Sequence, residues 1–564
     1  MVSILIDPRG DLQWETIPGL VEDAAARFGE TEALVDHHGP DGTTIRLTFD
    51  QLAEDVAAAT RALIANGIER GDRVAIWAPN SAAWVVAALG AVGAGAVLVP
   101  LNTRFKGAEA AYVLRSAGAR ILFTVQGFLG VDYPALLAAA VADGNELPDL
   151  ERVVLLQGGD SRQGGDGLQG GDGAESTRRR QGDPVIAWPD FLQEGTTVGE
   201  DVAAGRTASI SSGDPCDLIY TSGTTGRPKG VLNTHGQTLR TFATWAEVTG
   251  LDKGDRYLVV NPFFHTFGYK AGVLVCLMRG ATIVAEPVFD VEAVRARIAE
   301  EHISVLAGPP TIYQSILSHP DAAGLTSLRL AVTGAAVIPV DLVHQMQSEL
   351  GMETVLTGYG LTEATGVVTM CRRGDSAETI ALTSGRAIPD VEVQIVDADN
   401  HEVPQGEAGE ILVRGYTLMS GYWNAPAGAD EVIDADGWLH TGDVGTMDEN
   451  GNIAITDRLK DMYVCGGFNA YPAEIEAVLR DHPGVDQVAV IGIPDDRMGE
   501  VGCAYVVVAD GSTADDVAAG LADWSRERLA NYKVPRVVKV VDALPVSAAG
   551  KVLKRELRRQ FAAG

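Results

Sequence analysis

The segment TSGTTGRPKG at residues 221–230 is the stretch on which the interpretation of the whole chain depends. Its three glycines let backbone N–H groups approach a polyphosphate closely, and its threonines and serine add hydroxyl donors. Lys229 adds a positive charge near its end. It is not a Walker A loop, because Pro228 stands where that motif has Gly and Gly230 where it has Ser or Thr. We therefore expect a phosphate-binding loop of another type, placed directly after a strand over residues 217–220.

Short apolar runs alternate with helical patterns on both sides of this segment. Residues 49–66 predict an amphipathic helix and residues 73–78 a buried strand, and the alternation returns over residues 291–333. Helices of this length between short apolar strands indicate an α/β architecture with largely parallel sheets. Residues 82–101 carry no charge and have the length of a spanning helix, but their glycines and Pro100 favour a buried helix followed by a short strand.

The composition of the 564-residue chain is that of a folded protein, with 46% hydrophobic and 21% charged residues. The formal net charge is −32 at pH 7, which argues against nucleic-acid or anionic-membrane binding because both need basic surface. The five cysteines form no CxxC pair, so we expect reduced thiols in a cytoplasmic protein and no metal finger.

Two positions interrupt the pattern along the chain. Residues 157–184 contain QGGD three times, and such a Gly-rich repeat has too little apolar surface to offset its ordering entropy, so we expect a flexible surface insertion. Near residues 458–461 the pattern changes to that of a compact α+β unit, whose first helix begins at Pro472. The sequence therefore predicts an α/β large N-terminal body over residues 1–457, a hinge at 458–461 and a small α+β C-terminal lobe over 462–564.

Further motifs accompany the phosphate loop in a definite order along the chain. They are FFHTFG at 263–268, TGAA at 333–336, GYGLTE at 358–363, TGD at 441–443, DRLKD at 457–461, GGFNAYP at 466–472 and PVSAAGK at 545–551. Together they resemble the adenylate-forming superfamily of acyl-CoA synthetases, luciferases and peptide-synthetase adenylation domains. The resemblance covers the chain except the QGGD insertion. It implies the adenylate-forming enzyme fold and a reaction in which ATP converts a carboxylate to acyl-AMP, with loss of pyrophosphate, before transfer to a thiol.

The resemblance also implies a nucleotide site. Tyr359 would stack on the adenine, Asp443 would accept hydrogen bonds from the ribose hydroxyls, and Arg458 would reach the ribose or a phosphate. Glu363 would hold Mg²⁺, and Thr362 would contact the α-phosphate. The other implied ATP- and AMP-binding residues are Thr221, Ser222, Gly223, Thr224, Thr225, Gly226, Lys229, Gly334, Ala335 and Ala336.

The same resemblance assigns the catalytic and thiol-binding residues. Lys551 would bridge the attacking carboxylate and the α-phosphate, and with Thr362, Glu363 and His265 it would form the catalytic set. His265 would be a gate beside the acyl pocket, with a core histidine as the alternative. Gly466 and Gly467 would line the pantetheine tunnel of CoA, unless they form a plain turn. Lys460 would be the pivot about which the lobe rotates.

Several stretches resemble one actinobacterial subgroup more closely, the acyl-CoA synthetases of steroid C/D-ring degradation, which activate a propanoate on a bicyclic indanedione. In that case small residues would leave room for the rings, namely Gly308, Gly334, Ala335, Gly358 and Gly360. Ile312 and Phe267 would pack on the rings. Tyr269 or Lys270 would meet a ring ketone, although Lys270 facing solvent or the CoA phosphates is an equal alternative.

The predicted activity is thus an ATP-dependent acid–CoA ligase with ATP, Mg²⁺, CoA and a small carboxylic acid as its partners. Alternatives are a medium-chain fatty acid or aryl acid ligase, a domain that loads a carrier-protein thiol, a luciferase-like oxygenase and, from another class, a non-catalytic nucleotide-binding regulator. We expect neither nucleic acid nor integral membrane association. A homodimer is one of the open oligomeric states.

Overall fold

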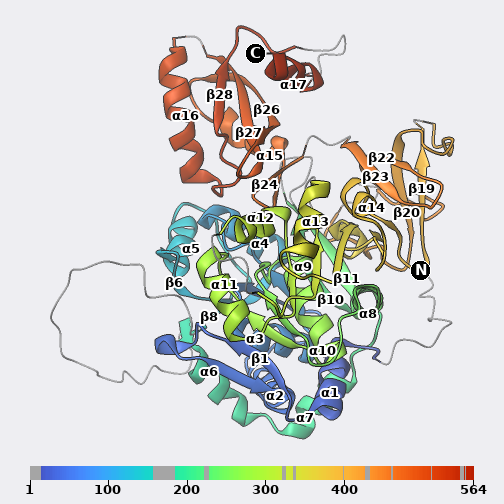
Figure 1. The fold of residues 1–564 in the computed structure, drawn as a ribbon. Coiled ribbons are helices and arrows are strands. Elements are labelled where there is room, and N and C mark those ends of the chain that lie inside the picture. Colours follow the sequence, from blue (N-terminus) through green and yellow to red (C-terminus); the bar gives the residue numbers. More distant parts are fainter. Residues whose placement is uncertain are drawn as a thin grey trace.

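The computed structural model describes residues 14–156, 185–221, 228–319, 325–334, 338–397, 399–425, 432–458, 462–509, 511–545, 552 and 554–563. A smaller lobe, orange to red, stands on a large body (Figure 1). Within the described residues the body holds a nine-stranded, an eight-stranded and a four-stranded sheet, and the lobe holds a five-stranded one. The predicted fold class, an α/β body with a small α+β lobe, is confirmed.

The eight-stranded sheet supports the phosphate loop. Its parallel part consists of β10 (Pro215–Thr221), β4 (Val97–Pro100), β3 (Arg73–Trp77), β5 (Ala119–Thr124), β8 (Arg152–Leu155) and β9 (Val185–Ala187). β11 (Lys229–Thr234) and β21 (Gly421–Tyr422) extend it in the antiparallel direction. Most residues of the central strands are buried, as expected where helices cover both faces of a parallel sheet.

The nine-stranded sheet carries Gly334 and Tyr359, which are predicted to contact the adenine. Five parallel neighbours, β16 (Thr354–Tyr359), β15 (Leu330–Thr333), β14 (Val305–Ala307), β12 (Arg256–Val259) and β13 (Thr282–Ala285), continue into β1 (Glu32–Asp36). β2 (Ile45–Thr48) at one edge and β17 (Thr369–Met370) with β18 (Arg386–Ala387) at the other are antiparallel. Gly334 follows β15 and Tyr359 ends β16, so both lie at carboxyl ends of parallel strands, where ligands of open α/β sheets bind.

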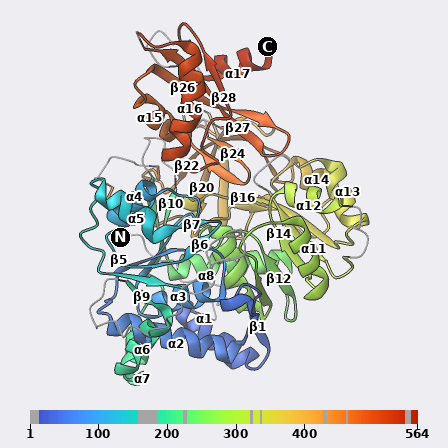
Figure 2. The ribbon, with the colours of Figure 1, turned by 90° about the vertical axis from the view of Figure 1, so that its left-hand side faces the viewer.

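Helices pack around these sheets (Figures 1 and 2). The predicted amphipathic helix is α2 (Phe49–Ala65), and Thr48 and Gln51 form its capping box. The uncharged stretch forms the buried α3 (Ala82–Gly93) followed by β4, as predicted. A Cβ added to Gly90 or Gly93 would lie 2.6 Å from Ala59 Cβ or 2.5 Å from Thr60 Oγ1 of α2, so these glycines permit close helix packing. Among the described helices none is both long and apolar enough to cross a membrane.

The other body helices of eight residues or more have ordinary boundaries. They are α1 (Ile17–Phe28), α4 (Gly107–Ala117), α5 (Tyr133–Ala142), α7 (Glu200–Ala208), α8 (His235–Thr249), α11 (Val291–Glu300), α12 (Pro310–Leu317) and α13 (Val340–Ser348).

The last sheet of the body in chain order is an antiparallel one that the sequence did not predict. It consists of β19 (Val391–Val396), β20 (Gly409–Gly415), β22 (Leu439–Met447) and β23 (Ile453–Arg458). It positions Asp443, which lies on β22 opposite Arg458 on β23.

The lobe has a hydrophobic core of its own. Its sheet contains β24 (Tyr463–Cys465), β25 (Phe468–Ala470), β26 (Val485–Asp495), β27 (Gly499–Val508) and β28 (Val537–Val540). Its helices are α15 (Pro472–Arg480), α16 (Ala514–Arg528) and α17 (Lys554–Ala563). The QGGD insertion at 157–184 and hinge residues 459–461 lie outside the described residues, so the predicted boundaries stay predictions.

Candidate active site

The phosphate loop closes a β-hairpin. Thr221 at the end of β10 is the register partner of Lys229 at the start of β11, and the Tyr112 hydroxyl donates to the Pro228 carbonyl at 3.2 Å. The loop is therefore anchored at both ends by sheet geometry. The loop residues between these anchors that the sequence assigned to phosphate binding lie outside the described residues, namely Ser222, Gly223, Thr224, Thr225 and Gly226.

One tyrosine connects the loop's lysine to the predicted metal ligand. Tyr422 on β21 lies beside β11, and Lys229 Nζ stands 5.0 Å from the centre of its ring. The Tyr422 hydroxyl donates to Glu363 Oε1 at 2.8 Å. Glu363 and Thr362 belong to the short helix η4 (Thr362–Ala364), and both are half-buried. A carboxylate beside the phosphate loop that accepts one hydroxyl bond keeps further lone pairs, which fits a hard cation such as Mg²⁺.

The ribose and adenine residues also meet in the structure. The Tyr359 hydroxyl donates to Asp443 Oδ2 at 2.7 Å, and burial together with the Asp443 charge raises the pKa of Tyr359 well above its ordinary value. The Asp443 amide donates to Thr441 Oγ1 at 3.1 Å. Gly334 approaches the same place, because a Cβ added to it would lie 3.3 Å from the Gly358 carbonyl oxygen. The placed part of the predicted nucleotide site is thus brought together, whereas Ala335, Ala336 and the Arg458 side chain lie outside the described residues.

Gly358 and Gly360 serve the backbone rather than a ligand. A Cβ added to Gly358 would lie 2.8 Å from the Thr369 carbonyl oxygen, and one added to Gly360 would lie 2.1 Å from that of Gly366. The space that their missing side chains leave is therefore filled by main chain. The prediction that these two glycines make room for a ring system is wrong.

His265 stands at the start of a short helix, α9 (Thr266–Gly268). Its Nδ1 accepts from the Phe267 amide at 3.2 Å, which fixes the ring orientation. Protein atoms around the ring remove part of its hydration and lower the pKa of His265 below its ordinary value, which favours the neutral imidazole at pH 7. Its surface is exposed, which disagrees with the alternative of a core histidine and agrees with a gate.

A tight turn of the lobe lies against the part of the body that contains Pro309 and Phe264. Gly466 and Gly467 have φ of +58° and +84° and connect the paired ends of β24 and β25, the two-residue hairpin geometry that favours Gly at both positions. A Cβ added to Gly467 would lie 3.7 Å from Pro309 of the body. Phe468, next in sequence, stacks on Phe264 with ring centres 6.4 Å apart. The two glycines therefore form a turn, and that turn faces the His265 region.

The same interface contains an ion cluster that the sequence did not reveal. Lys533 Nζ of the lobe lies 2.8 Å from Glu109 Oε1 of the body and 2.6 Å from Glu474 Oε1 of the lobe. Burial acts to lower the pKa of Lys533, but the charges of Tyr532 and both glutamates outweigh it and raise that pKa. The Tyr532 hydroxyl accepts from Asn102 Nδ2 at 3.3 Å. No local motif marks a pair whose members are 424 positions apart.

Lys551 and Lys460 lie outside the described residues. The helix α17 begins three residues after Lys551, and its Lys554 pairs with Glu476 at 2.6 Å. The Leu557 carbonyl accepts from the Tyr505 hydroxyl at 3.2 Å. In Figures 1 and 2 this helix lies at the end of the lobe away from the body.

The structure corrects the prediction for Lys270. Its Nζ is fully buried, 2.8 Å from Asp217 Oδ2 and 3.1 Å from Thr238 Oγ1. It therefore contacts neither a ring ketone nor solvent nor the CoA phosphates. Tyr269 is also buried and packs edge-on against Trp84, and Ile312 belongs to a hydrophobic core cluster. Phe267 is half-buried and remains a candidate for contact with the acid.

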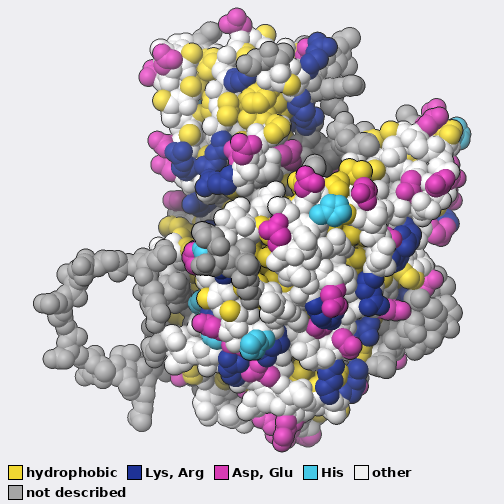
Figure 3. All heavy atoms as spheres, in the orientation of Figure 1, with side chains coloured by type: hydrophobic (Ala, Val, Ile, Leu, Met, Phe, Trp, Pro, Cys, Tyr) yellow, Lys and Arg dark blue, Asp and Glu magenta, His cyan; other side chains and the backbone are white. Residues whose placement is uncertain are grey.

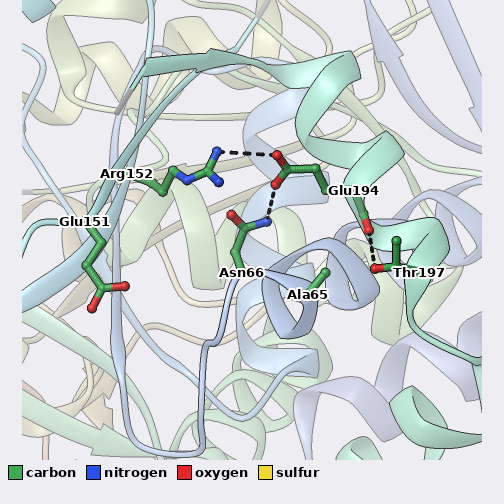
Figure 4. A pocket seen from close by; sticks show the side chains of 6 residues that line it. All are labelled: Ala65, Asn66, Glu151, Arg152, Glu194 and Thr197. Atoms are coloured by element: carbon green, nitrogen blue, oxygen red, sulfur yellow. Dashed lines mark hydrogen bonds and ion pairs between the residues drawn. The ribbon is translucent and has the colours of Figure 1, made fainter. Parts of the chain in front are cut away.

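A polar pocket of about 320 Å³ lies elsewhere on the body and is drawn in Figure 4. Glu194 in its wall accepts from Asn66 Nδ2 at 2.9 Å and from Arg152 at 3.5 Å. None of the predicted site residues lines it; its lining is Ala65, Asn66, Glu151, Arg152, Glu194 and Thr197.

Comparisons with known proteins agree with this geometry. Residues 21–423 match the family model described as AMP-binding enzyme, and residues 474–551 match that of the AMP-binding enzyme C-terminal domain. Two relatives, from Rhodococcus jostii (strain RHA1) and Mycobacterium tuberculosis, are propanoyl:CoA ligases named for a 7a-methyl-1,5-dioxo-octahydro-1H-inden-4-yl ring. The first is 48% identical over 97% of this chain and 98% of its own length, and the second 48% over 93% and 96%.

A solved structure extends the likeness to the fold of the whole chain. The amide bond synthetase McbA from Marinactinospora thermotolerans superposes with a TM-score of 0.76 at 27% identity, covering 97% of this chain and 99% of its own. The family model spans more than half of the chain, and its C-terminal companion matches the lobe. This protein therefore belongs to the AMP-binding enzyme family.

Proposed function

We propose that this protein is an AMP-forming acid–CoA ligase. The observation that carries the proposal is the stacking of Phe468, which follows the Gly466–Gly467 turn of the lobe, on Phe264, which precedes His265 in the body. That contact brings a candidate thiol channel to the acid gate. Of the proposed nucleotide residues in the same body, Tyr359 ends β16 and its hydroxyl donates to Asp443 on β22.

The first half-reaction joins two anions, so it needs positive charge and preorganised donors. A carboxylate oxygen of the acid attacks the α-phosphorus, and the bond to the leaving pyrophosphate breaks. Lys229 and the loop would hold the β- and γ-phosphates, Asp443 and Tyr359 the nucleoside, and Thr362 the α-phosphate. Lys551 would neutralise the acid and the α-phosphate as they meet. A Mg²⁺ ion held by Glu363 would supply further charge neutralisation at the phosphates.

The second half-reaction forms the thioester. The sulfur of CoA attacks the acyl carbon, and AMP leaves with the electron pair of the broken C–O bond. A neutral His265 would position the acid and the thiol. The acidic protein offers local positive charge for CoA, because Lys and Arg side chains gather on the side of the lobe just above the body (Figure 3). On that side α16 ends with the exposed Arg526 and Arg528.

The two half-reactions would use different faces of the lobe. The helix α17, whose first residue follows Lys551 by three positions in the sequence, lies away from the body. A role for Lys551 in adenylation therefore requires the lobe to turn, and Lys460 in the predicted hinge is the proposed pivot. The described arrangement, with the glycine turn against the body, suits thioester formation.

For the acid we propose a propanoate on a methyl-dioxo-octahydroindene ring system. The support is the 48% identity to two ligases named for that acid, which extends over nearly the whole chain. Among the side chains predicted to contact the rings, Phe267 keeps a position compatible with this role.

A panel of acids tests both proposals. The purified protein is mixed with ATP, Mg²⁺, CoA and the ring propanoate, octanoate or benzoate, and AMP, pyrophosphate and thioester mass are measured. We expect kcat/KM for the ring propanoate to exceed the others by at least ~100-fold, about 2.7 kcal/mol of discrimination. Comparable rates with octanoate would refute the ring assignment alone. Release of pyrophosphate without any CoA thioester would refute the ligase and favour carrier-protein loading or another acceptor.

A further inference from the structure

A row of four buried polar side chains crosses the body beneath the candidate site. Lys270 Nζ lies 2.8 Å from Asp217 Oδ2, and Asn233 Nδ2 donates to Asp217 Oδ1 at 2.9 Å. The Thr365 hydroxyl lies 3.1 Å from Asn233 Oδ1 and 2.6 Å from the Thr417 carbonyl oxygen, between which its proton is shared. All four side chains have no exposed surface. This row, Lys270–Asp217–Asn233–Thr365, is called the buried polar row below.

Each member of the row lies close in sequence to a residue of the proposed site. Lys270 follows His265 by five residues, and Asp217 precedes Thr221 by four on β10. Asn233 follows Lys229 by four on β11 and is the register partner of Asp217. Thr365 follows Glu363 by two. The row therefore connects the segment that contains His265, both strands of the phosphate-loop hairpin and the turn that carries Glu363.

Thr365 adopts a backbone conformation that its side chain disfavours. Its φ is +56°, and left-handed backbone in a β-branched residue costs on the order of 1–3 kcal/mol unless the surroundings enforce it. Here the hydroxyl bonds enforce it, and the Thr365 amide closes η4 by donating to the Thr362 carbonyl. The turn that aims Thr362 and Glu363 is therefore held by a side chain that touches neither nucleotide nor metal.

A contribution to folding stability is a weak explanation for the Lys270–Asp217 ion pair at the other end of the row. A buried pair frequently contributes nothing over apolar residues of the same volume, because desolvation offsets the attraction. Both carboxylate oxygens of Asp217, however, have defined partners. Oδ1 accepts from Asn233, and Oδ2 contacts Lys270 Nζ and also accepts from Cys216 Sγ at 3.2 Å. Lys270 belongs to η3 (Tyr269–Leu274), a π-helical segment, and such segments are frequent at functional sites.

We infer that the buried polar row is a set of positioning residues, in which Asn233 and Thr365 orient the Glu363 turn toward Mg·ATP and Asp217 and Lys270 hold the His265 segment in register with it. The inference rests on the proposed function, which assigns the Glu363 turn to Mg·ATP and the His265 segment to the acid. It assigns no chemical step to these residues. Removing the Thr365 hydroxyl should therefore weaken binding of Mg·ATP, and removing the charges of Asp217 and Lys270 should weaken binding of the acid.

The Thr365→Val variant tests the nucleotide side, with Thr365→Ser as the matched control. Valine keeps the shape and the backbone cost, and serine keeps the hydroxyl. Equilibrium binding of Mg·ATP needs neither acid nor CoA, so failure of the proposed function leaves this measurement intact. We expect the Kd for Mg·ATP to rise about 10-fold or more in Thr365→Val, the loss of roughly one buried hydrogen bond, and to stay within ~3-fold of wild type in Thr365→Ser.

The double variant Asp217→Asn with Lys270→Met tests the acid side. It removes both charges together, so that neither is left buried and unpaired. We expect the KM for the acid to rise about 10-fold while the Kd for Mg·ATP changes less than ~3-fold, with thermal unfolding within a few degrees of wild type. Wild-type ligand binding in both Thr365→Val and the double variant would overturn the inference. Equal losses on both sides in proportion to the loss of thermal stability would also overturn it, because they would indicate a purely structural role.

Discussion

Glu109 and Lys533 connect the body to the lobe in the arrangement that suits thioester formation, and Glu109→Gln tests whether this contact holds that arrangement. The Nζ–Oε1 distance is 2.8 Å, and Lys533 is 1% and Glu109 12% exposed. Glu109 Oε2 also accepts from the Lys106 amide at the start of α4, a cap that glutamine can keep. The substitution thus removes the charge with little change of the helix.

The magnitude follows from the geometry of the cluster. Lys533 keeps Glu474 as a partner at 2.6 Å, so the loss is smaller than that of an orphaned buried charge. One charge-assisted hydrogen bond contributes about 1.5–3 kcal/mol. The single amide oxygen of glutamine caps the Lys106 amide, so its NH2 group faces Lys533 and that bond is lost. Because Lys533 keeps Glu474, the lower bound applies. We expect thioester formation from supplied acyl-AMP and CoA to slow about 10-fold, since about 1.4 kcal/mol corresponds to a factor of ten.

Single-turnover measurements separate the two half-reactions. Adenylation, followed as pyrophosphate release in the absence of CoA, should keep its wild-type rate or rise, because the lobe is freed from the body. Glu54→Gln, the same chemical change on the exposed face of α2, is the control and should leave both rates unchanged. If Glu109→Gln slows both half-reactions equally, or neither, the contact does not select between arrangements of the lobe.

Four further predictions concern the nucleotide site, catalysis, pH and the insertion. Asp443→Asn should weaken ATP binding about 10–100-fold, because an amide loses one of the two acceptor oxygens that suit a ribose diol; unchanged binding by calorimetry would contradict the ribose role. Lys551→Ala should slow pyrophosphate release ~10³-fold or more yet still convert supplied acyl-AMP to thioester, and parallel losses in stopped-flow assays would argue against its assignment. Burial lowers the pKa of His235 to about 4 in the folded protein. As the pH falls below about 6.5 the unfolded chain therefore binds a proton that the folded chain does not, and the free energy of unfolding should drop by about 2 kcal/mol between pH 7 and 5. Urea melts of His235→Asn, which keeps an acceptor for the Ile17 amide, should lack this pH-dependent drop. Deleting residues 157–172, which contain the three QGGD repeats, leaves thirteen residues to connect the parallel strands β8 and β9. This length is enough for a crossover, so turnover and melting temperature should change little, and a collapse of either would assign the repeats a role.

Local patterns determined much of this protein. The period of apolar residues over 49–66 predicted α2 almost to the residue, because helix burial is encoded by spacing along the chain itself. Paired glycines at 466 and 467 left a turn as the alternative to a tunnel lining, and the structure shows the turn, because few other residues adopt positive φ at two consecutive positions. The order of the motifs, from the phosphate loop to the TGD of Asp443, identified the family. It also predicted the nucleotide roles of Tyr359 and Asp443, whose side chains meet in the structure.

The tertiary structure decided where chemically ambiguous side chains belong. Lys270 had a pocket, solvent or CoA as alternatives in the sequence, yet it pairs with Asp217 inside the core. Gly358 suggested space for a ligand, but the Thr369 backbone fills that space. Lys533 carried no motif and meets Glu109 from 424 positions away. A lysine or glycine has the same local signature in all these settings, because burial and partner choice are set by how distant segments pack, and packing depends on the whole chain rather than on neighbours in sequence.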